Sequence, residues 1–236
     1  MGKSLIIKGA NFSTNGIAPT FRRLSWIGGS TKNGLDQSTP SGQYINSGVS
    51  STINTKIIVE FTLDSTAHSV WVCGGNTNNV SSICFWAQSS STVFYMSVVN
   101  GQSSTNSLTI SQSLWDGRKH VVEISKEKVV LDGITHNFAT ASSYSGSTTG
   151  EIYLDCVAQS SANNYNSRAY DSTQEVALTN AVKIHNVKIY TDYQDESSLA
   201  VDAIPVLRLS DNVVCFYNTV NGEYLERNNG STPEYE

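Results

Sequence analysis

Charge and long apolar runs are both scarce in this sequence. Lys, Arg, Asp and Glu make up 15% of the 236 residues, the formal net charge is -5, and basic residues form no run. Nucleic acid and anionic membranes both require clustered cations, so the composition argues against either as a partner. No apolar segment approaches the roughly 18 residues of a transmembrane helix, so we expect no membrane insertion.

An export signal is missing as well. The apolar run at residues 5–7 ends at Lys8, whereas a secretory signal needs about 7 to 15 apolar residues. We therefore expect a soluble chain that is made in the cytosol without a signal peptide.

Cysteines are few and follow no metal-binding or redox pattern. Cys73, Cys84, Cys156 and Cys215 each lie in an apolar, strand-like run, with no CxxC pair and no histidine at ligand spacing. Buried, reduced thiols are the expected state for a protein made in the cytosol. A disulfide between Cys73 and Cys84 across a hairpin loop stays an alternative, as does a metal site.

Helical periodicity does not extend beyond one or two turns anywhere in the chain, and two-residue alternation replaces it. Ile57, Val59, Phe61 and Leu63 alternate with more polar residues, which is typical of a strand with one buried face. Further strands are predicted at residues 69–73, 83–87, 93–99, 120–125, 128–131, 151–158 and 176–191. The strand at 128–131 is expected to end in a turn at Asp132-Gly133. We predict an all-β fold, a two-sheet antiparallel β-sandwich.

The C-terminal part reads as a closing β-meander. Alternation marks strands around residues 187–189 and 214–216, and turn-forming residues lie at 210–212 and 221–222. This region contains the short motifs KIY, AIP and VNGEY. With them its sequence resembles the concanavalin A-like lectin/glucanase domain (LamG-like) of gut Bacteroidales and their tailed phages. Three further motifs extend the resemblance from about Leu24 to the C-terminus. They are GQYINSG at 42–48, LWDGRKH at 114–120 and VVLDG at 129–133.

The resemblance implies a sandwich of the concanavalin A jelly-roll type preceded by a short leader. We expect two parts, an N-terminal attachment segment at residues 1–23 and the sandwich at residues 24–236. Proteins on this fold include lectins, hydrolases and structural modules, so the resemblance leaves the activity open.

The leader contains apolar residues without a core of its own. Leu5, Ile6, Ile7 and Phe12 need a surface to pack against, either the sandwich itself, as an added edge strand, or a neighbouring subunit. We expect the second arrangement and therefore a homo-oligomer, a trimer by analogy with phage fibres.

Catalytic patterns are absent from the sequence. Retaining glucanases need two carboxyl groups about 5 to 5.5 Å apart, whereas Glu151 and Asp155 would lie roughly 13 Å apart along an extended strand. The four histidines, His68, His120, His136 and His185, have no spacing for a metal or a general base. We expect no enzyme activity and no cofactor. A calcium site that uses Asp155 and loop carbonyls stays an alternative.

Two segments combine aromatic rings with amides, which is the chemistry that binds sugars. The first, at residues 74–79, is flanked by Trp71 and Trp86, and the second spans residues 163–171. We predict a carbohydrate site formed by Asn76, Asn78, Trp86, Tyr165 and Arg168. The alternative is that Trp71 and Trp86 belong to the core and the asparagines only form turns.

These features together predict a lectin-like, non-catalytic component of a virion, such as a head or tail fibre, that adheres to host-surface polysaccharide. Its partners would be that glycan and other virion proteins. Two alternatives remain: a purely structural virion decoration protein without a ligand, and a glycan-binding or hydrolase module at a bacterial cell surface.

Overall fold

The computed structural model describes most of the predicted strands and the turns between some of them. The described residues are 20–24, 26–27, 45–52, 54–63, 69–74, 83–88, 93–98, 110, 114, 116–138, 150–154, 157–159, 164–166, 182–226 and 234–235. Within these ranges the chain is almost entirely antiparallel β-structure, and the only helical element is a 3-10 turn, η2, at Glu196–Ser198. None of the described residues form a helix that is long and apolar enough to cross a membrane.

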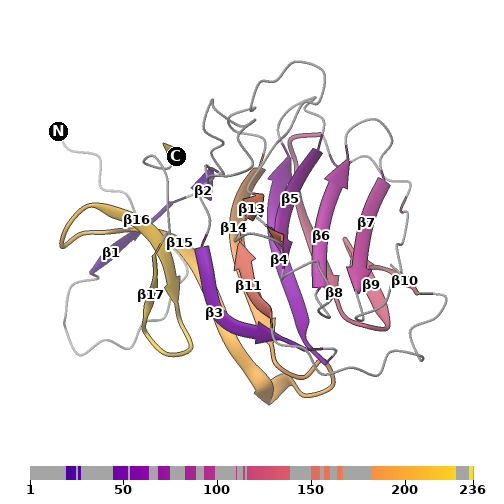
Figure 1. Ribbon diagram of the computed structural model, residues 1–236. Coiled ribbons are helices and arrows are strands. Elements are labelled where there is room, and N and C mark those ends of the chain that lie inside the picture. Colours follow the sequence, from indigo (N-terminus) through magenta and orange to yellow (C-terminus); the bar gives the residue numbers. More distant parts are fainter. Residues whose placement is uncertain are drawn as a thin grey trace.

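The larger of the two main sheets has eleven strands, eight of which follow one another in the order β10-β9-β8-β4-β14-β15-β16-β17 (Figure 1). Three short strands extend it: β1 pairs with β15, β2 with β14, and β18 with β2. The bounds are β1 Phe21–Arg23, β2 Trp26–Ile27, β4 Lys56–Leu63, β8 Lys119–Ile124, β9 Lys128–Leu131, β10 Ile134–Asn137, β14 Val182–Tyr190, β15 Leu199–Arg208, β16 Val213–Asn218, β17 Tyr224–Leu225 and β18 Glu234–Tyr235.

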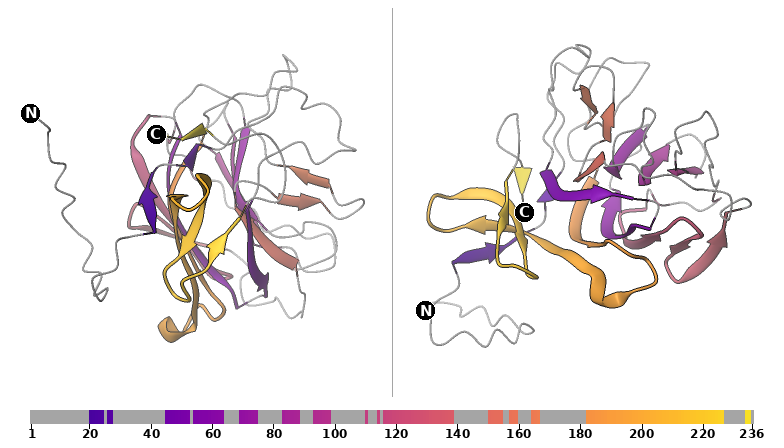
Figure 2. Two further views of the ribbon diagram at one scale, coloured as in Figure 1. Left: turned by 90° about the vertical axis from the view of Figure 1, so that its left-hand side faces the viewer. Right: turned by 60° about the horizontal axis from the view of Figure 1, so that its bottom comes forward.

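The second sheet has five strands in the order β3-β11-β5-β6-β7, and a separate two-stranded ribbon joins β12 to β13. Their bounds are β3 Ile45–Ser51, β5 Ser69–Gly74, β6 Ile83–Gln88, β7 Val93–Val98, β11 Gly150–Leu154, β12 Val157–Gln159 and β13 Asn164–Asn166. Figures 1 and 2 show the five-stranded sheet packed as a layer against the eleven-stranded sheet. The predicted all-β, two-sheet antiparallel sandwich is confirmed.

The core lies between the two layers and follows the alternation of the sequence. Ile57, Val59, Phe61 and Leu63 of β4 are all fully buried. Val59 pairs with Val122 in β8 and Val187 in β14, so one apolar row crosses three strands. Ile45 and Ile152 enter the same apolar cluster from the five-stranded sheet. Directly paired residues lie on one face of a sheet, so each row adds a continuous strip to the core.

The hairpin between β9 and β10 turns on Asp132 and Gly133. Both have positive φ values, 49° and 82°, as a two-residue type I′ turn requires. The sequence prediction of a turn at Asp132-Gly133 is therefore confirmed, and the turn begins an additional strand, β10, that the alternation did not reveal.

The predicted strand at 151–158 proved to be two strands in different sheets, so that prediction was wrong in its continuity. Residues up to Leu154 pair within the five-stranded sheet, whereas Val157 pairs with Asn166 in the ribbon. Both halves have strand-like composition, and only the choice of pairing partner separates them.

The predicted leader ends inside the eleven-stranded sheet. Its last three residues form β1, in which Phe21 pairs with Arg208 and Arg23 pairs with Val206. Phe21 also packs against a small second apolar cluster built on Ile204, Val206 and Cys215. The assembly residues Leu5, Ile6, Ile7 and Phe12 lie outside the described residues.

Val121 and Val122 are adjacent in β8, and a comparison of the two tests which face of this strand lies in the core. Val122 is 1% exposed and Val121 is 42% exposed. Both changes to alanine remove the same methyl groups from the same strand, but only Val122→Ala opens a cavity. We expect Val122→Ala to lower the free energy of unfolding by about 2 kcal/mol more than Val121→Ala, as measured by urea unfolding. Equal losses would contradict the proposed core.

Candidate functional site

Ile45 identifies which face of the five-stranded sheet meets the core. It is fully buried in the main apolar cluster. From Ile45 the pairing continues through Leu154 in β11, Cys73 in β5, Phe85 in β6 and Met96 in β7. Because directly paired residues share a face of a sheet, these positions form one row that is in register with Ile45.

The neighbouring row of the register consists of aromatic residues. Trp86 follows Phe85 in β6, and successive strand residues alternate between faces. Trp86 pairs with Trp71 in β5 and with Tyr95 in β7. We call these three positions, Trp71, Trp86 and Tyr95, the aromatic row. The side chains of this row lie outside the part of the chain that the structure describes, so the alternative that Trp71 and Trp86 belong to the core stays beside the prediction of a binding role.

A β-bulge makes this arrangement possible. The pairing of β5 with β6 shifts between Trp71 and Cys73, so these two positions lie on opposite faces although they are two residues apart. Strict alternation in the sequence would have put Trp71 and Cys73 on one face. Bulges insert a residue without a reliable sequence signal, which is why the sequence did not reveal the row.

The register positions on either side of the aromatic row hold serine, glutamine, cysteine, glycine and valine residues. Ser69 pairs with Gln88, and Ser97 pairs with Cys84, two residues from Trp86. Tyr153 adds a fourth aromatic residue, paired with Asn46 and Gly74. The five strands contain a single charged residue, Glu151, whose partner Ser50 is exposed.

The ribbon of β12 and β13 lies beside the outward face of the five-stranded sheet. β12 contacts both β5 and β11, and Figures 1 and 2 show the ribbon on the side of the five-stranded sheet that faces away from the larger sheet. The ribbon contains Tyr165, which pairs with Ala158. Two predicted site residues, Trp86 and Tyr165, therefore come from elements on the same side of the molecule. The other three, Asn76, Asn78 and Arg168, lie outside the described residues.

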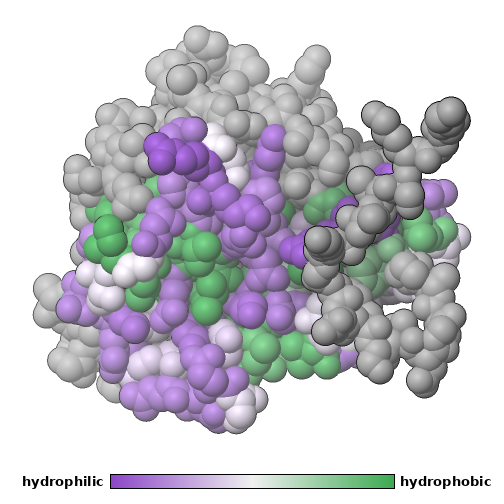
Figure 3. Space-filling model, turned by 180° about the vertical axis from the view of Figure 1, so that it is seen from behind, coloured by the Kyte–Doolittle hydropathy of each residue, from purple (hydrophilic) through white to green (hydrophobic). Residues whose placement is uncertain are grey.

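The outer face of the eleven-stranded sheet has a different chemistry, because cross-strand ion pairs cover it. Seen from behind, it is largely hydrophilic with apolar patches between (Figure 3). The ion pairs are Lys119–Glu60 at 2.7 Å, Lys188–Asp202 at 3.6 Å and Lys128–Glu123 at 3.8 Å. Each ion pair of this kind, on a solvated face, contributes little free energy to stability.

His120 is the most enclosed histidine of the described residues, at 5% exposure. Its Nε2 lies 3.0 Å from Asp116 Oδ1 and its Nδ1 lies 2.8 Å from Asp132 Oδ2. These two contacts fix the orientation of the imidazole ring. The two carboxylates lie at opposite ends of the ring, and no group of three potential metal ligands is found among the described residues.

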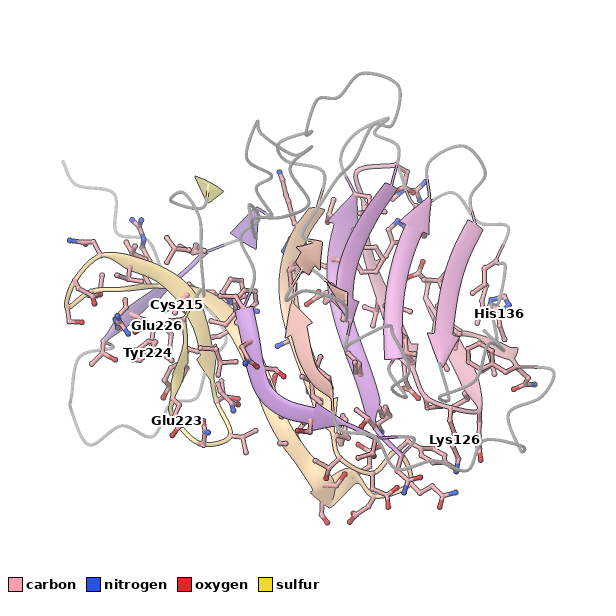
Figure 4. The ribbon with its side chains drawn as sticks, viewed as in Figure 1. Lys126, His136, Cys215, Glu223, Tyr224 and Glu226 are labelled. Atoms are coloured by element: carbon pink, nitrogen blue, oxygen red, sulfur yellow. The ribbon has the colours of Figure 1, made fainter. Side chains whose placement is uncertain are left out.

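A second aromatic cluster, at the C-terminal meander, is held by internal contacts. Phe21 packs on Tyr217 with 4.6 Å between ring centroids, and Tyr217 packs on Tyr224 at 5.2 Å. Arg208 covers the Tyr224 ring and forms ion pairs with Asp211 and Glu226. Figure 4 shows Tyr224 and Glu226 in the lobe formed by β16 and β17. These contacts fasten β1 to the meander and have a structural role.

The thiols differ in their surroundings. Cys215 is buried and unpaired, and burial raises the pKa of its thiol to about 11, so it remains protonated and unreactive near neutrality. In the register of β5 and β6, Cys73 pairs with Phe85 and Cys84 pairs with Gly74. The side chains of Cys73 and Cys84 lie outside the described residues, so a disulfide between them stays an alternative.

No family model matches the sequence, and a search of curated proteins finds no relative. Solved structures with a similar arrangement include the native heptameric SAP-like pentraxin from Limulus polyphemus. It is 11% identical, with 72% of this chain and 77% of that chain covered and a TM-score of 0.48. A likeness of this size does not bear on function.

The acid stability of the fold should depend on Asp116. The backbone N–H of Arg118 and the contact with His120 lower the pKa of Asp116 below its ordinary 3.8. Its ionised form therefore stabilises the fold above about pH 4, and this stabilisation is lost as the pH falls through the lowered pKa. Asp116→Asn should weaken the pH dependence of the free energy of unfolding below about pH 4, measured by urea titration. An unchanged acid profile would show that Asp116 has no such role.

Proposed function

We propose that this protein is a non-catalytic, lectin-like module that binds glycan on the outward face of its five-stranded sheet. The observation that supports this is the register of β5, β6 and β7, which pairs Trp71, Trp86 and Tyr95 in one aromatic row. Sugar rings present C–H faces that stack on aromatic rings, and hydroxyl groups that bond to amides and hydroxyls. A rigid sheet holds these groups in place before the ligand arrives, which lowers the entropic cost of binding.

A single site of this kind binds weakly. Each aromatic contact contributes about 0.5 to 1.5 kcal/mol beyond the buried area, so three of them with a few hydrogen bonds give a dissociation constant of about a millimolar. Several copies on one particle would raise the effective affinity by about 10² to 10⁴. Weak binding by one domain is therefore compatible with firm adhesion by an assembly.

The composition of the face supports the absence of catalysis. Glycoside hydrolysis by either stereochemical route requires two carboxyl groups that flank the scissile bond. Among the strands of the five-stranded sheet, Glu151 is the one carboxylate, and Asp155 lies outside the described residues. Stacking and hydrogen bonding also require no metal, so we propose binding without a cofactor and keep calcium at Asp155 as the alternative.

We further propose that the protein is a virion fibre or adhesion component that binds host-surface polysaccharide, attaches to other virion proteins through its leader and resides in the virion. The resemblance to phage-associated lectin-like domains supports this context. The placement of β1 is compatible with it, because β1 joins the eleven-stranded sheet and the aromatic row belongs to the outward face of the other layer. Attachment through the leader would leave the aromatic row accessible. The alternatives remain a ligand-free virion decoration protein and a module at a bacterial cell surface.

Trp86 and its neighbour Phe85 separate a surface role from a core role. Trp86→Ala should weaken binding to glycan by about tenfold and lower the free energy of unfolding by less than about 1 kcal/mol. Phe85→Ala changes the adjacent, core-face position and should cost about 3 to 5 kcal/mol of stability. Binding is measured by retention on immobilised host polysaccharide and stability by urea unfolding.

Trp71→Ala and Tyr95→Ala should behave as Trp86→Ala does. Tyr165→Ala tests whether the ribbon belongs to the same site, because its loss would weaken binding without unfolding the sheet. If Trp86→Ala unfolds the protein, Trp86 is a core residue. If all four variants fold and bind normally, the glycan site is not on this face.

The leader is tested by deleting residues 1–19. The deletion must stop before β1, because Phe21 packs on Tyr217 in the second aromatic cluster. If Leu5, Ile6, Ile7 and Phe12 pack between subunits, the shortened protein should be a folded monomer and the full chain a homo-oligomer, a trimer in our proposal. Light scattering measures both masses. A shortened protein that keeps the mass of the full-length oligomer would show that the leader does not assemble it.

A further inference from the structure

We infer that Asp116, His120 and Asp132 form a proton-dependent clasp, in which a protonated His120 ring joins the segment before β8 to the turn between β9 and β10. The clasp lies in the eleven-stranded sheet and does not depend on the proposed glycan binding. Its side chains come from the motifs LWDGRKH at 114–120 and VVLDG at 129–133, to which the proposed binding site assigns no role.

Each ring nitrogen of His120 faces a separate carboxylate. Nε2 lies 3.0 Å from Asp116 Oδ1, and Nδ1 lies 2.8 Å from Asp132 Oδ2. The ring is 5% exposed and packs beside Phe61 of β4, with 5.9 Å between the ring centroids. A neutral imidazole has one N–H group and can donate to only one of these oxygens, whereas a protonated ring donates to both. The geometry therefore fits an imidazolium between two carboxylates.

The backbone holds both carboxylates in place beside the ring. Asp116 Oδ1 accepts a hydrogen bond from the N–H of Arg118 at 2.9 Å, and Asp132 Oδ1 accepts one from the N–H of Val121 at 2.9 Å. The N–H of Arg118, together with the contact to His120, holds the pKa of Asp116 below its ordinary 3.8. Asp116 is therefore ionised near neutrality and has no proton to donate, so the bound proton belongs to the ring.

The other charged groups near the ring do not cancel the two carboxylates. Arg118 pairs with Asp116 at 3.1 Å, but its side chain is 81% exposed. Solvent and salt screen an exposed charge more than the enclosed charge of His120. Lys119 pairs with Glu60 of β4 at 2.7 Å, and because successive strand residues alternate between faces, this pair lies on the other face of β8.

The clasp fastens two chain segments to the start of β8. The N–H of Gly117 donates to the carbonyl of Leu63 at 3.2 Å, and the N–H of Asp132 donates to the carbonyl of Val121 at 2.9 Å. When the His120 ring loses its proton, one nitrogen changes from donor to acceptor and faces a carboxylate. One of the two segments then loses its side-chain attachment to β8, and the folded state is held less firmly.

The bound proton fixes the direction in which stability changes with pH. Histidines of an unfolded chain are mostly neutral above about pH 6.5. Above that pH the folded protein holds one proton more than the unfolded chain. The stability that the clasp contributes is therefore complete below about pH 6.5 and is lost as the pH rises.

His185 is a matched control in the same sheet. Its Nε2 lies 2.9 Å from Thr62 Oγ1, a hydroxyl that can donate to a neutral ring. Burial, followed by the charge of Lys119, lowers the pKa of His185 below its ordinary 6.5. The effect of His185 on stability therefore has the opposite sign, because stability is lost as the pH falls.

NMR spectroscopy of the histidine ring nitrogens in the full-length wild-type protein tests the proton directly. At about pH 7 both ring nitrogens of His120 should be protonated, whereas one ring nitrogen of His185 should be unprotonated. An unprotonated nitrogen in the His120 ring at this pH would overturn the clasp. Because the wild type is measured, the result does not depend on the folding of any variant.

Urea unfolding at a series of pH values measures the bound proton through stability. Between about pH 6.5 and 8, the unfolding equilibrium constant of the wild type should rise about tenfold relative to that of His120→Gln. His185→Gln should keep the rise of the wild type. Parallel profiles for the wild type and His120→Gln, or a rise that only His185→Gln removes, would contradict the clasp.

Asp116→Asn and Asp132→Asn test the two ends of the clasp separately. Each substitution leaves one carboxylate beside the ring, so each should reduce the rise from about tenfold to about threefold or less. A rise that neither substitution reduces would show that these carboxylates do not hold the proton, and the clasp would be wrong.

Discussion

Every surface property of this protein depends on the burial of one apolar layer between two antiparallel sheets. Because side chains alternate along a strand, the residues that face the core decide which residues face outward. Ile45 marks this constraint in the five-stranded sheet, since it is fully buried and the register puts Phe85 in its row. Trp86 then takes the alternate register position, so the aromatic row follows from the pairing of the strands.

The two sheets differ in the polar residues that their strands contain. The eleven-stranded sheet covers its outer face with ion pairs such as Lys119–Glu60 and with hydrogen bonds such as Thr62–His185, at 2.9 Å. The strands of the five-stranded sheet contain almost no charge and instead combine aromatic residues with Ser, Asn and Gln.

Much of the fold was predictable because the alternation is strong wherever one face is buried. The strand at 56–63 and the strand at 128–131 were predicted almost to the residue, and the turn at Asp132-Gly133 was predicted from its composition. The strand at 151–158 was not, because Leu154 and Val157 have the same composition and pair with different partners. For the candidate site, the sequence pointed to Trp86 and Tyr165 as binding residues and to Trp71 as a flank. It did not identify Tyr95 or Tyr153, because nothing local distinguishes a tyrosine on an outward row from one in the core.

The sequence by itself determined the class of fold, the positions of most strands, and the low charge that argues against nucleic-acid and membrane partners. These properties depend on composition and on local periodicity, which are fixed before any strand finds its partner. The tertiary structure alone decided that Trp71, Trp86 and Tyr95 occupy one row of the register and that β1 joins the larger sheet. These properties depend on register and on a bulge between Trp71 and Cys73. A shift of one residue in a strand moves every side chain to the other face, and only the packing of the two sheets selects between them.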